Sequence, residues 1–366
     1  MASQGGGTPF RGDKADKARP LNLQRKGEYS MRQLNVAIVG TGFMGKLYGR
    51  ILKQLPTARV VAVCDLVEAP MREFAAEIGA AAYPGADVKA MLAVQPEIEA
   101  VLICTPEDQH VEAACLAAQA GKHILVEKPL AMTAEGGQRI VDAVREAGVF
   151  SMMGYVLRFD PRYSGARDAV AKGEVGDVVH MYARRNTPLF LLRRIGGRVS
   201  GTFWVGVHDL DIMLWIKGCP ATRVFSRQAG ASVAEFKVDQ AIVSTLQFAD
   251  GSIATLENVW GVAMTPGRHD RLEFQINGTR GTVEVHPAET GLGVFNEGSA
   301  VYPDTVYMPN LHGRTVGVYR DEIEHFVSSI LAGVSPVVTV EDGLKAVVVA
   351  EAIERSRATG QEVIIS

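Results

Sequence analysis

A glycine-rich turn between an apolar run and a helical stretch constrains this chain more than any other feature. Residues 34–39 (LNVAIV) form a short apolar run, and Gly-Thr-Gly-Phe-Met-Gly follows at once at positions 40–45. The residues after the turn, KLYGRILKQL, have the apolar spacing of a helix. A second apolar run, RVVAVC at 59–64, ends at Asp65, 20 positions after Gly45. This order of strand, glycine turn, helix and acidic strand end is typical of a dinucleotide-binding unit.

Each part of this unit has a physical task toward a bound dinucleotide. Gly40 permits the tight turn, Gly42 lets the backbone approach a pyrophosphate, and Gly45 allows close packing of helix on strand. The N-terminus of the helix attracts the negative charge. Asp65 would accept hydrogen bonds from the adenosine ribose hydroxyls and repel a 2′-phosphate, so NAD is favoured over NADP. The alternative is a glycine turn used only for packing, with Asp65 as a solvated strand end.

The first half of the chain continues as alternating strands and helices. Helical stretches are expected through 68–78 and 109–120, and apolar strands at 100–104 and 123–127. Continuous apolar runs separated by helices indicate a parallel sheet covered on both faces. We therefore predict an α/β class protein whose N-terminal domain, residues 31–152, is a doubly wound Rossmann sheet.

A lysine lies where the chemistry of such a sheet is expected. Residues 126–130 read Val-Glu-Lys-Pro-Leu and follow a predicted strand. Open α/β sheets bind ligands beyond the carboxyl ends of their strands, so Lys128 is placed where a nicotinamide and its substrate would meet. Pro129 restricts the local backbone and is compatible with a cis bond. The alternative is a lysine exposed on a loop.

At this point the sequence strongly resembles the glucose–fructose oxidoreductase / inositol dehydrogenase (Gfo/Idh/MocA) family. The matching features are the glycine turn, Asp65, Cys104-Thr105-Pro106 with His110, Glu127-Lys128-Pro129, His208-Asp209, and a closing segment at 340–346. The resemblance covers about residues 31–366. It implies that Lys128 contacts both cofactor and substrate hydroxyl, and that Thr105, Pro106 and His110 line the nicotinamide side. The expected cofactor-binding set is Gly40, Thr41, Gly42, Phe43, Met44, Gly45, Asp65, Thr105, Pro106, His110, Glu127 and Lys128.

The second half has a different pattern. Residues 177–187, 222–229, 240–249, 252–261, 271–277 and 281–286 are expected to be strands. Asp250-Gly251 and Asn277-Gly278 are hairpin turn signals. Residues 153–366 are thus predicted to form an α+β substrate domain with a large, open, mostly antiparallel sheet, whose last helix could pack back on the Rossmann domain. The resemblance implies a homodimer or homotetramer built through one face of this sheet.

His208 is the second catalytic candidate. It matches the catalytic histidine of the family, and an unperturbed pKa of about 6.5 suits a group that takes and returns a proton. The structural alternative is a helix-embedded histidine bonded to a carbonyl. Many family dehydrogenases carry an aspartate four residues earlier, where this chain has Trp204. Either another group such as Asn186 or a water assists His208, or the chemistry departs from plain inositol-type oxidation.

Further substrate-binding candidates are Arg158, Asn186, Trp204, Asp209 and Tyr319. Arginines gather at Arg184, Arg185, Arg193, Arg194 and Arg198. Guanidinium groups bind carboxylate, phosphate or sulfonate bidentately, so an anionic sugar derivative is one hypothesis. Solvated arginines and subunit contacts are the alternatives, and helix packing is the alternative for Tyr319.

The bulk properties narrow the class of protein. The net charge of −3 gives no global reason to expect nucleic acid or membrane partners. Residues 1–30 carry six Lys/Arg against three Asp/Glu and little apolar pattern, so we expect a disordered tail. The four cysteines form no CxxC pair and are expected to be reduced thiols in a cytoplasmic protein. No metal-site motif is present, so no metal is expected.

Together these patterns predict hydride transfer between a secondary alcohol of a sugar, sugar acid or cyclitol and NAD. Lys128 would polarise the hydroxyl and His208 would remove its proton, while the cofactor carries the redox step. One alternative is a glycosidase that recycles NAD through transient oxidation and elimination. Another is an inactive cofactor-binding regulatory protein, against which the presence of Lys128 argues.

Overall fold

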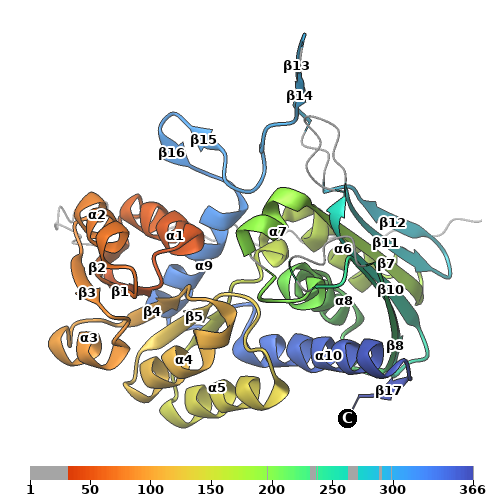
Figure 1. The fold of residues 1–366 in the computed structure, drawn as a ribbon, viewed down its shortest axis with the longest axis horizontal. Helices are drawn as coiled ribbons and strands as arrows, with labels where there is room; N and C mark the ends of the chain where they lie inside the picture. Colours follow the sequence, from red (N-terminus) through yellow and green to blue (C-terminus); the bar gives the residue numbers. More distant parts are fainter. Residues whose placement is uncertain are drawn as a thin grey trace, which may run out of the picture. The chain divides into compact units, whose positions relative to one another are not determined.

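A computed structural model describes residues 32–195, 197–230, 236, 238–262, 271–287, 291–297 and 299–365. The tail expected over residues 1–30 lies outside this description. Within it, two large sheets organise the chain, and their strands and helices appear in Figure 1 under the labels used below.

The first sheet is parallel and has the order β3-β2-β1-β4-β5-β6. Its strands are β1 (Leu34–Val39), β2 (Ala58–Asp65), β3 (Ala81–Pro84), β4 (Ala100–Ile103), β5 (His123–Val126) and β6 (Ser151–Met153). Every residue of β4 is buried, as its continuous apolar sequence predicts for a strand covered on both faces. The strand order confirms the predicted doubly wound Rossmann fold.

Helices on the two faces supply that cover. They are α1 (Phe43–Lys53), α2 (Glu68–Ile78), α3 (Val88–Val94), α4 (His110–Gln119) and α5 (Ala134–Ala147), with a short 3₁₀ turn, η1 (Glu107–Gln109), before α4. Helix α1 packs against α2, whereas α4 packs against α3 and α5 on the opposite face (Figure 1). The helix predicted through 109–120 is thus the η1–α4 pair, and β3, α3, α5 and β6 are additional to the sequence prediction.

The second sheet is mixed, with the order β12-β11-β7-β10-β9-β8-β17. Its strands are β7 (Val178–Pro188), β8 (Ala221–Ala229), β9 (Ala241–Phe248), β10 (Ile253–Val262), β11 (Arg271–Gly278), β12 (Thr282–Val285) and β17 (Val363–Ile364). Neighbours are antiparallel except β7 and β10, which run parallel. Buried and exposed residues alternate along β9, so one face of this sheet is packed and the other faces outward. The predicted, mostly antiparallel sheet is confirmed.

The two hairpin signals differ in accuracy. Asp250 and Gly251 form the turn between β9 and β10, with φ of +88° at Gly251. The turn predicted at Asn277-Gly278 is wrong by about two residues, because Asn277 still pairs with Thr282 and β11 extends to Gly278. A Cβ at Gly278 would lie 2.2 Å from the Val175 carbonyl oxygen, so close backbone approach explains this glycine.

The remaining helices pack mainly between the sheets and their loops. They are η2 (Val156–Phe159), α6 (Pro161–Ala171), α7 (Leu189–Ile195), a π-helical turn η3 (Thr202–Gly206), α8 (Val207–Lys217), α9 (Val318–Ala332) and α10 (Val340–Thr359). Two small hairpins, β13 (Val294–Asn296) with β14 (Ser299–Val301) and β15 (Asn310–Leu311) with β16 (Arg314–Thr315), complete the described elements. Helix α10 contacts α5, α8 and β8, so it joins the two halves (Figure 1).

The described residues contain no helix that is long and apolar enough to cross a membrane. The four cysteines are free thiols, and Cys64 and Cys115 are buried.

Candidate active site

The glycine turn has the close backbone packing that its sequence predicts. Gly40 has φ of +90°, and a Cβ there would lie 2.5 Å from the Cys104 carbonyl oxygen. A Cβ at Gly45 would lie 2.0 Å from the Gly40 carbonyl oxygen. Only glycine fits either position without moving backbone. By contrast, a Cβ at Gly42 would meet nothing within 4 Å, so the turn presents open backbone there.

The glycine turn leads directly into helix α1. Gly42 is the N-cap residue of α1 and provides no side-chain cap. The first turn of α1 contains no acidic residue, and Phe43 and Met44 form its first two positions. A helix N-terminus without a capping side chain is a binding site for phosphate. The turn and helix therefore fit a dinucleotide pyrophosphate.

Asp65 lies at the end of β2 and bonds to the turn. Its Oδ2 accepts a hydrogen bond from the Thr41 backbone N–H and another, at 2.9 Å, from the Thr41 hydroxyl. Its Oδ1 accepts one from the Val67 N–H at 2.8 Å. The carboxylate is partly exposed and fixed beside the turn, as a ribose acceptor needs to be.

Lys128 lies at the carboxyl end of β5, and the bond between Lys128 and Pro129 is cis. The ammonium donates a hydrogen bond to the Trp204 carbonyl oxygen at 2.8 Å and lies 4.1 Å from the centre of the Trp204 ring. Burial lowers the pKa of this ammonium, and the carboxylates of Glu127 and Glu107 partly offset the effect. Trp204 therefore holds the ammonium through one hydrogen bond and one cation–π contact.

His208 lies at the start of α8, directly after the π-helical turn that carries Trp204. Burial, with the positive charges of Lys128 and Arg185, holds the pKa of the imidazole well below its ordinary value of 6.5. Its Nδ1 has no hydrogen-bond partner among the described residues. The imidazole is therefore neutral at physiological pH, and its Nδ1 makes no hydrogen bond to any described residue.

His110 joins the ends of two strands. Its Nδ1 lies 2.7 Å from the Pro129 carbonyl oxygen and its Nε2 lies 3.0 Å from the Thr105 carbonyl oxygen. It connects the residues after β4 with those after β5 and so positions the Lys128 loop. Pro106 is the N-cap residue of η1, and the buried Thr105 hydroxyl has no partner among the described residues.

Glu127 is buried beside the helix of the glycine turn. Its Oε1 accepts a hydrogen bond from the Tyr48 hydroxyl at 2.6 Å, and its Oε2 accepts one from the Lys128 N–H at 3.0 Å. Tyr319, from α9, packs edge-on to the Tyr48 ring with centroids 6.3 Å apart. Tyr319 therefore belongs to the packing around Glu127, and its backbone N–H bonds to the Tyr307 carbonyl oxygen.

Two predicted substrate ligands lie in buried ion pairs. Arg158 donates two hydrogen bonds to Asp211, at 2.6 and 2.9 Å, and one to Asp342 at 3.1 Å. Asp209 accepts two from Arg185, at 2.7 and 2.8 Å. Each of these charged groups has a buried partner of opposite charge. Because Asp209 and Asp211 lie on α8, the two pairs hold the helix that carries His208, and we do not propose Arg158 and Asp209 as substrate ligands.

Asn186 is also committed within the protein. Its amide nitrogen donates to Glu257 at 2.7 Å, and its oxygen accepts from the Val259 N–H at 2.9 Å. Each end of the amide thus has one partner within the protein, which holds the Asn186 side chain against β10.

The arginine cluster is explained largely by internal ion pairs. Arg184 pairs with Glu273 at 2.7 Å, Arg185 pairs with Asp209, and Arg198 pairs with Glu107 at 2.8 Å. Arg193 is exposed, and the side chain of Arg194 lies outside the description. The hypothesis of an anionic substrate loses its support here, because three of these guanidinium groups already have carboxylate partners.

Known proteins show the same organisation. Residues 34–155 match the model of an oxidoreductase family with an NAD-binding Rossmann fold, and residues 167–365 match that of the family's C-terminal alpha/beta domain. The chain is 30% identical over 342 residues to the inositol 2-dehydrogenase of Rhizobium meliloti (strain 1021), covering 90% of this chain and 98% of that protein. The chain belongs to the Gfo/Idh/MocA oxidoreductase family.

Two further Gfo/Idh/MocA proteins illustrate the range of relatives. The crystal structure of myo-inositol 2-dehydrogenase from Lactobacillus plantarum aligns with a TM-score of 0.80 and 25% identity, covering 92% of this chain and 100% of that chain. The 2,7-anhydro-N-acetylneuraminate hydratase of Mediterraneibacter gnavus is 29% identical over 271 residues, covering 71% of this chain and 69% of that protein. Relatives of similar identity thus carry names of different reactions.

Sequence reasoning missed two residues that lie around the Gfo/Idh/MocA motifs in this chain. The Tyr48 hydroxyl contacts Glu127, and Glu322 contacts the Tyr48 hydroxyl. Arg185 was considered only for anion binding, whereas its positive charge lowers the pKa of His208. The available signal for Glu322 was its place on the buried face of α9. Glutamate is rarely fully buried unless it is paired, so a glutamate at such a position indicates a specific role.

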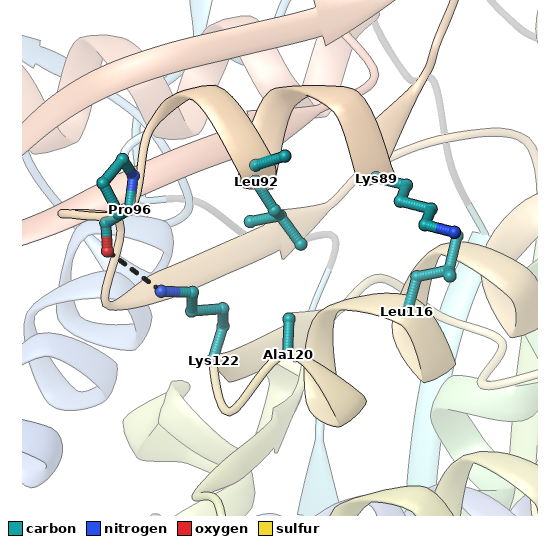
Figure 2. A pocket seen from close by; sticks show the side chains of 7 residues that line it. Lys89, Leu92, Pro96, Leu116, Ala120 and Lys122 are labelled. Carbon is teal, nitrogen blue, oxygen red and sulfur yellow. Dashed lines mark hydrogen bonds between the residues drawn. The ribbon is translucent and has the colours of Figure 1, made fainter.

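A pocket elsewhere on the Rossmann half contains none of the predicted site residues. It has a volume of about 290 Å³ and lies between α3 and α4, with Leu92 and Leu116 in its wall and Lys89 and Lys122 at its rim (Figure 2). Lys122 donates a hydrogen bond to the Pro96 carbonyl oxygen at 3.1 Å. The pocket is therefore separate from the site built around Lys128.

Proposed function

We propose that this protein is an NAD-dependent dehydrogenase that oxidises a secondary alcohol of a sugar or cyclitol. The observation that carries the proposal is the oriented Lys128 ammonium at the end of β5, acting electrostatically on a neutral His208. The names of the inositol dehydrogenase relatives support the substrate class.

Lys128 stabilises the alkoxide character that develops on the substrate oxygen. An ammonium in a buried site interacts more strongly with such charge than it does in water. The Trp204 carbonyl oxygen and ring hold the ammonium in place, and its other N–H groups can donate to a substrate hydroxyl. Lys128 thus polarises the reacting alcohol.

His208 takes the hydroxyl proton as the alcohol is oxidised. Its neutral imidazole is the form that accepts a proton, and burial, with the positive charges of Lys128 and Arg185, lowers its pKa and so favours that form. Nicotinamide, when bound, supplies the hydride acceptor. The glycine turn, the N-terminus of α1 and Asp65 would hold the dinucleotide.

The decisive experiment follows NADH absorbance at saturating NAD with a panel of neutral sugars, cyclitols, sugar acids and sugar phosphates. Accumulation of NADH with one class of substrate supports the proposal and names the class. If NAD binds and the panel gives no net NADH, the proposal is rejected in favour of a reaction without net oxidation.

Trp204 favours a second candidate reaction. It stands where many relatives have an aspartate and places an aromatic ring on Lys128. Relatives named as hydratases show that a net change other than oxidation is compatible with this family. In that case oxidation, elimination and reduction would follow within one turnover, and NADH would not accumulate.

Both limbs of the pH profile of kcat/KM should lie at lower pH than the ordinary pKa values of histidine and lysine predict. His208 must be neutral, and its lowered pKa moves the loss of activity on acidification below pH 6.5. Lys128 must be charged, and its lowered pKa moves the loss at alkaline pH below 10.5. Steady-state rates with a neutral substrate measure both limbs. The exposed His286→Gln is the control that should leave them in place, and an acid limb at or above 6.5 contradicts the assignment.

Asp65→Ala should lower kcat/KM for NAD by about 10–100-fold and narrow the preference for NAD over NADP. The variant removes a charged acceptor, and hydrogen bonds to charged groups contribute about 1.5–3 kcal/mol. It also removes the repulsion of a 2′-phosphate. Rates measured over a titration of each cofactor give the ratio of kcat/KM for NAD to kcat/KM for NADP. Asp142→Ala, on the exposed face of α5, is the control. An unchanged ratio would remove Asp65 from the ribose site.

A further inference from the structure

One buried hydroxyl joins three distant parts of the chain. The Tyr48 oxygen, on α1, lies 2.6 Å from Glu127 Oε1 after β5 and 2.9 Å from Glu322 Oε2 on α9. Tyr48 and Glu322 are fully buried, and Glu127 is 6% exposed. The helix of the glycine turn, the Lys128 loop and α9 therefore meet at a single polar cluster.

The groups that face this cluster come from every element around it. Cys104 follows β4, Tyr319 lies on α9, and Lys128 and Glu107 act on Glu127. Lys128 supplies the positive charge, and it adjoins Glu127 in the sequence. Glu322 is affected chiefly by burial and by the charge of Glu127.

Counting protons limits the charge of the cluster. A phenol has one hydrogen, so Tyr48 can donate fully to one carboxyl group. The second short oxygen–oxygen contact then needs a hydrogen from the other carboxyl. Two ionised carboxylates around one buried hydroxyl would also repel one another in a poorly solvated site. One glutamate is therefore a neutral carboxylic acid.

The contacts identify which glutamate is neutral. Burial raises the pKa of Glu127, but Glu127 accepts the Lys128 N–H and feels the charge of Lys128, and both of these favour its ionised form. Glu322 Oε1 is buried and has no hydrogen-bond partner among the described residues. A bare carbonyl oxygen tolerates that environment better than half of an ionised carboxylate does. Burial correspondingly raises the pKa of Glu322 well above its ordinary value.

We propose that Glu322 is a neutral carboxylic acid that donates its proton to Tyr48, so that Tyr48 donates to Glu127 and holds it ionised beside Lys128. Glu322 and Tyr48 are thus positioning residues for the Lys128 ammonium, a role that rests on the proposed function. Gly154 leaves room for the arrangement, because a Cβ there would lie 3.1 Å from the Glu127 carboxyl carbon.

The first test needs neither substrate nor turnover. Infrared difference spectra of the full chain at pH 8 are recorded for wild type against Glu322→Gln and Glu127→Gln. The carbonyl band of a protonated carboxylic acid, shifted by deuterium, is expected in wild type and Glu127→Gln and absent from Glu322→Gln. A band that survives in Glu322→Gln, or that is missing from wild type, overturns the proposal. This result stands or falls independently of the dehydrogenase activity.

The second test measures the consequence for Lys128. In Tyr48→Phe, Glu127 loses the hydrogen bond that holds its carboxylate next to Lys128, so the negative charge stabilises the ammonium less. The alkaline limb of kcat/KM should move about one pH unit lower, a typical effect of one close charge. Glu322→Gln should keep the wild-type limb, because its amide N–H replaces the acid O–H toward Tyr48.

Tyr182→Phe is the matched control, since the Tyr182 hydroxyl makes an equally short bond, 2.6 Å, to Glu257 in the second sheet. It should leave the alkaline limb unchanged. If Tyr48→Phe lowers stability without moving the limb, Tyr48 is merely structural and the positioning role is rejected. If wild type reduces no NAD at all, the proposed function fails while the infrared assignment of Glu322 remains open to its own test.

Discussion

Lys128→Ala is expected to lower kcat/KM for NAD reduction by about 10²–10³-fold, the usual loss when one donor to a developing oxyanion is removed. The ammonium is desolvated and oriented on Trp204, so water that enters the variant site cannot reproduce its field. The effect should fall mainly on kcat, because the interaction with the oxygen strengthens as its proton leaves. Initial rates of NADH formation, followed by absorbance with the substrate found in the panel, measure the change in kcat and kcat/KM.

Two controls separate this chemistry from folding and cofactor binding. Lys122→Ala, at the rim of the separate pocket, should retain the wild-type rate, because it removes a lysine that has no contact with the site. Cofactor binding by Lys128→Ala, followed by NADH fluorescence, should weaken far less than the rate. A rate within threefold of wild type would exclude Lys128 from the reaction.

The Rossmann half was predictable because its signals are local. Apolar runs, a glycine turn and one acidic strand end lie close together in the chain, and each determines its own neighbourhood. Gly45 illustrates this, since the backbone contact that requires a glycine there is with Gly40 in the same turn. The second sheet was predictable for the same reason, because alternation along each strand marks its buried face.

The surroundings of Lys128 and His208 were less predictable, because they depend on partners far away in the sequence. Arg158 and Asn186 were reasonable substrate ligands as isolated polar residues. The structure shows that Asp211, Asp342 and Glu257 engage them. No periodicity relates such partners, so a polar residue near the site cannot be assigned to substrate or to protein before the fold is known.

Glu322 is a residue that the sequence did not single out, although the structure places it next to the site. It lies 274 positions from Tyr48, and its helix reads as an ordinary amphipathic segment. Only the packing of α9 against α1 and η2 brings its carboxyl group to the Tyr48 hydroxyl. The sequence could indicate the chemistry at Lys128, but the groups that set its charge emerge from tertiary packing.

Asp211→Ala is expected to lower the free energy of unfolding by about 3–5 kcal/mol, the cost of leaving one partner of a buried ion pair uncompensated. Arg158 and Asp211 are almost completely buried, and the guanidinium gives two hydrogen bonds to this carboxylate. Burial raises the pKa of Asp211 to about 6, so chemical denaturation at pH 8 compares states in which the wild-type group is ionised.

The double variant Arg158→Met/Asp211→Leu distinguishes this explanation from loss of packing. Well-packed apolar residues often replace a buried ion pair without loss, so the double variant should be more stable than Asp211→Ala. Asp168→Ala, which breaks an exposed contact with Arg167, should cost less than about 1 kcal/mol. If Asp211→Ala costs no more than this control, the ion pair does not anchor α8. If the expected loss is found, the Arg158–Asp211 pair helps to hold α8, the helix that carries His208.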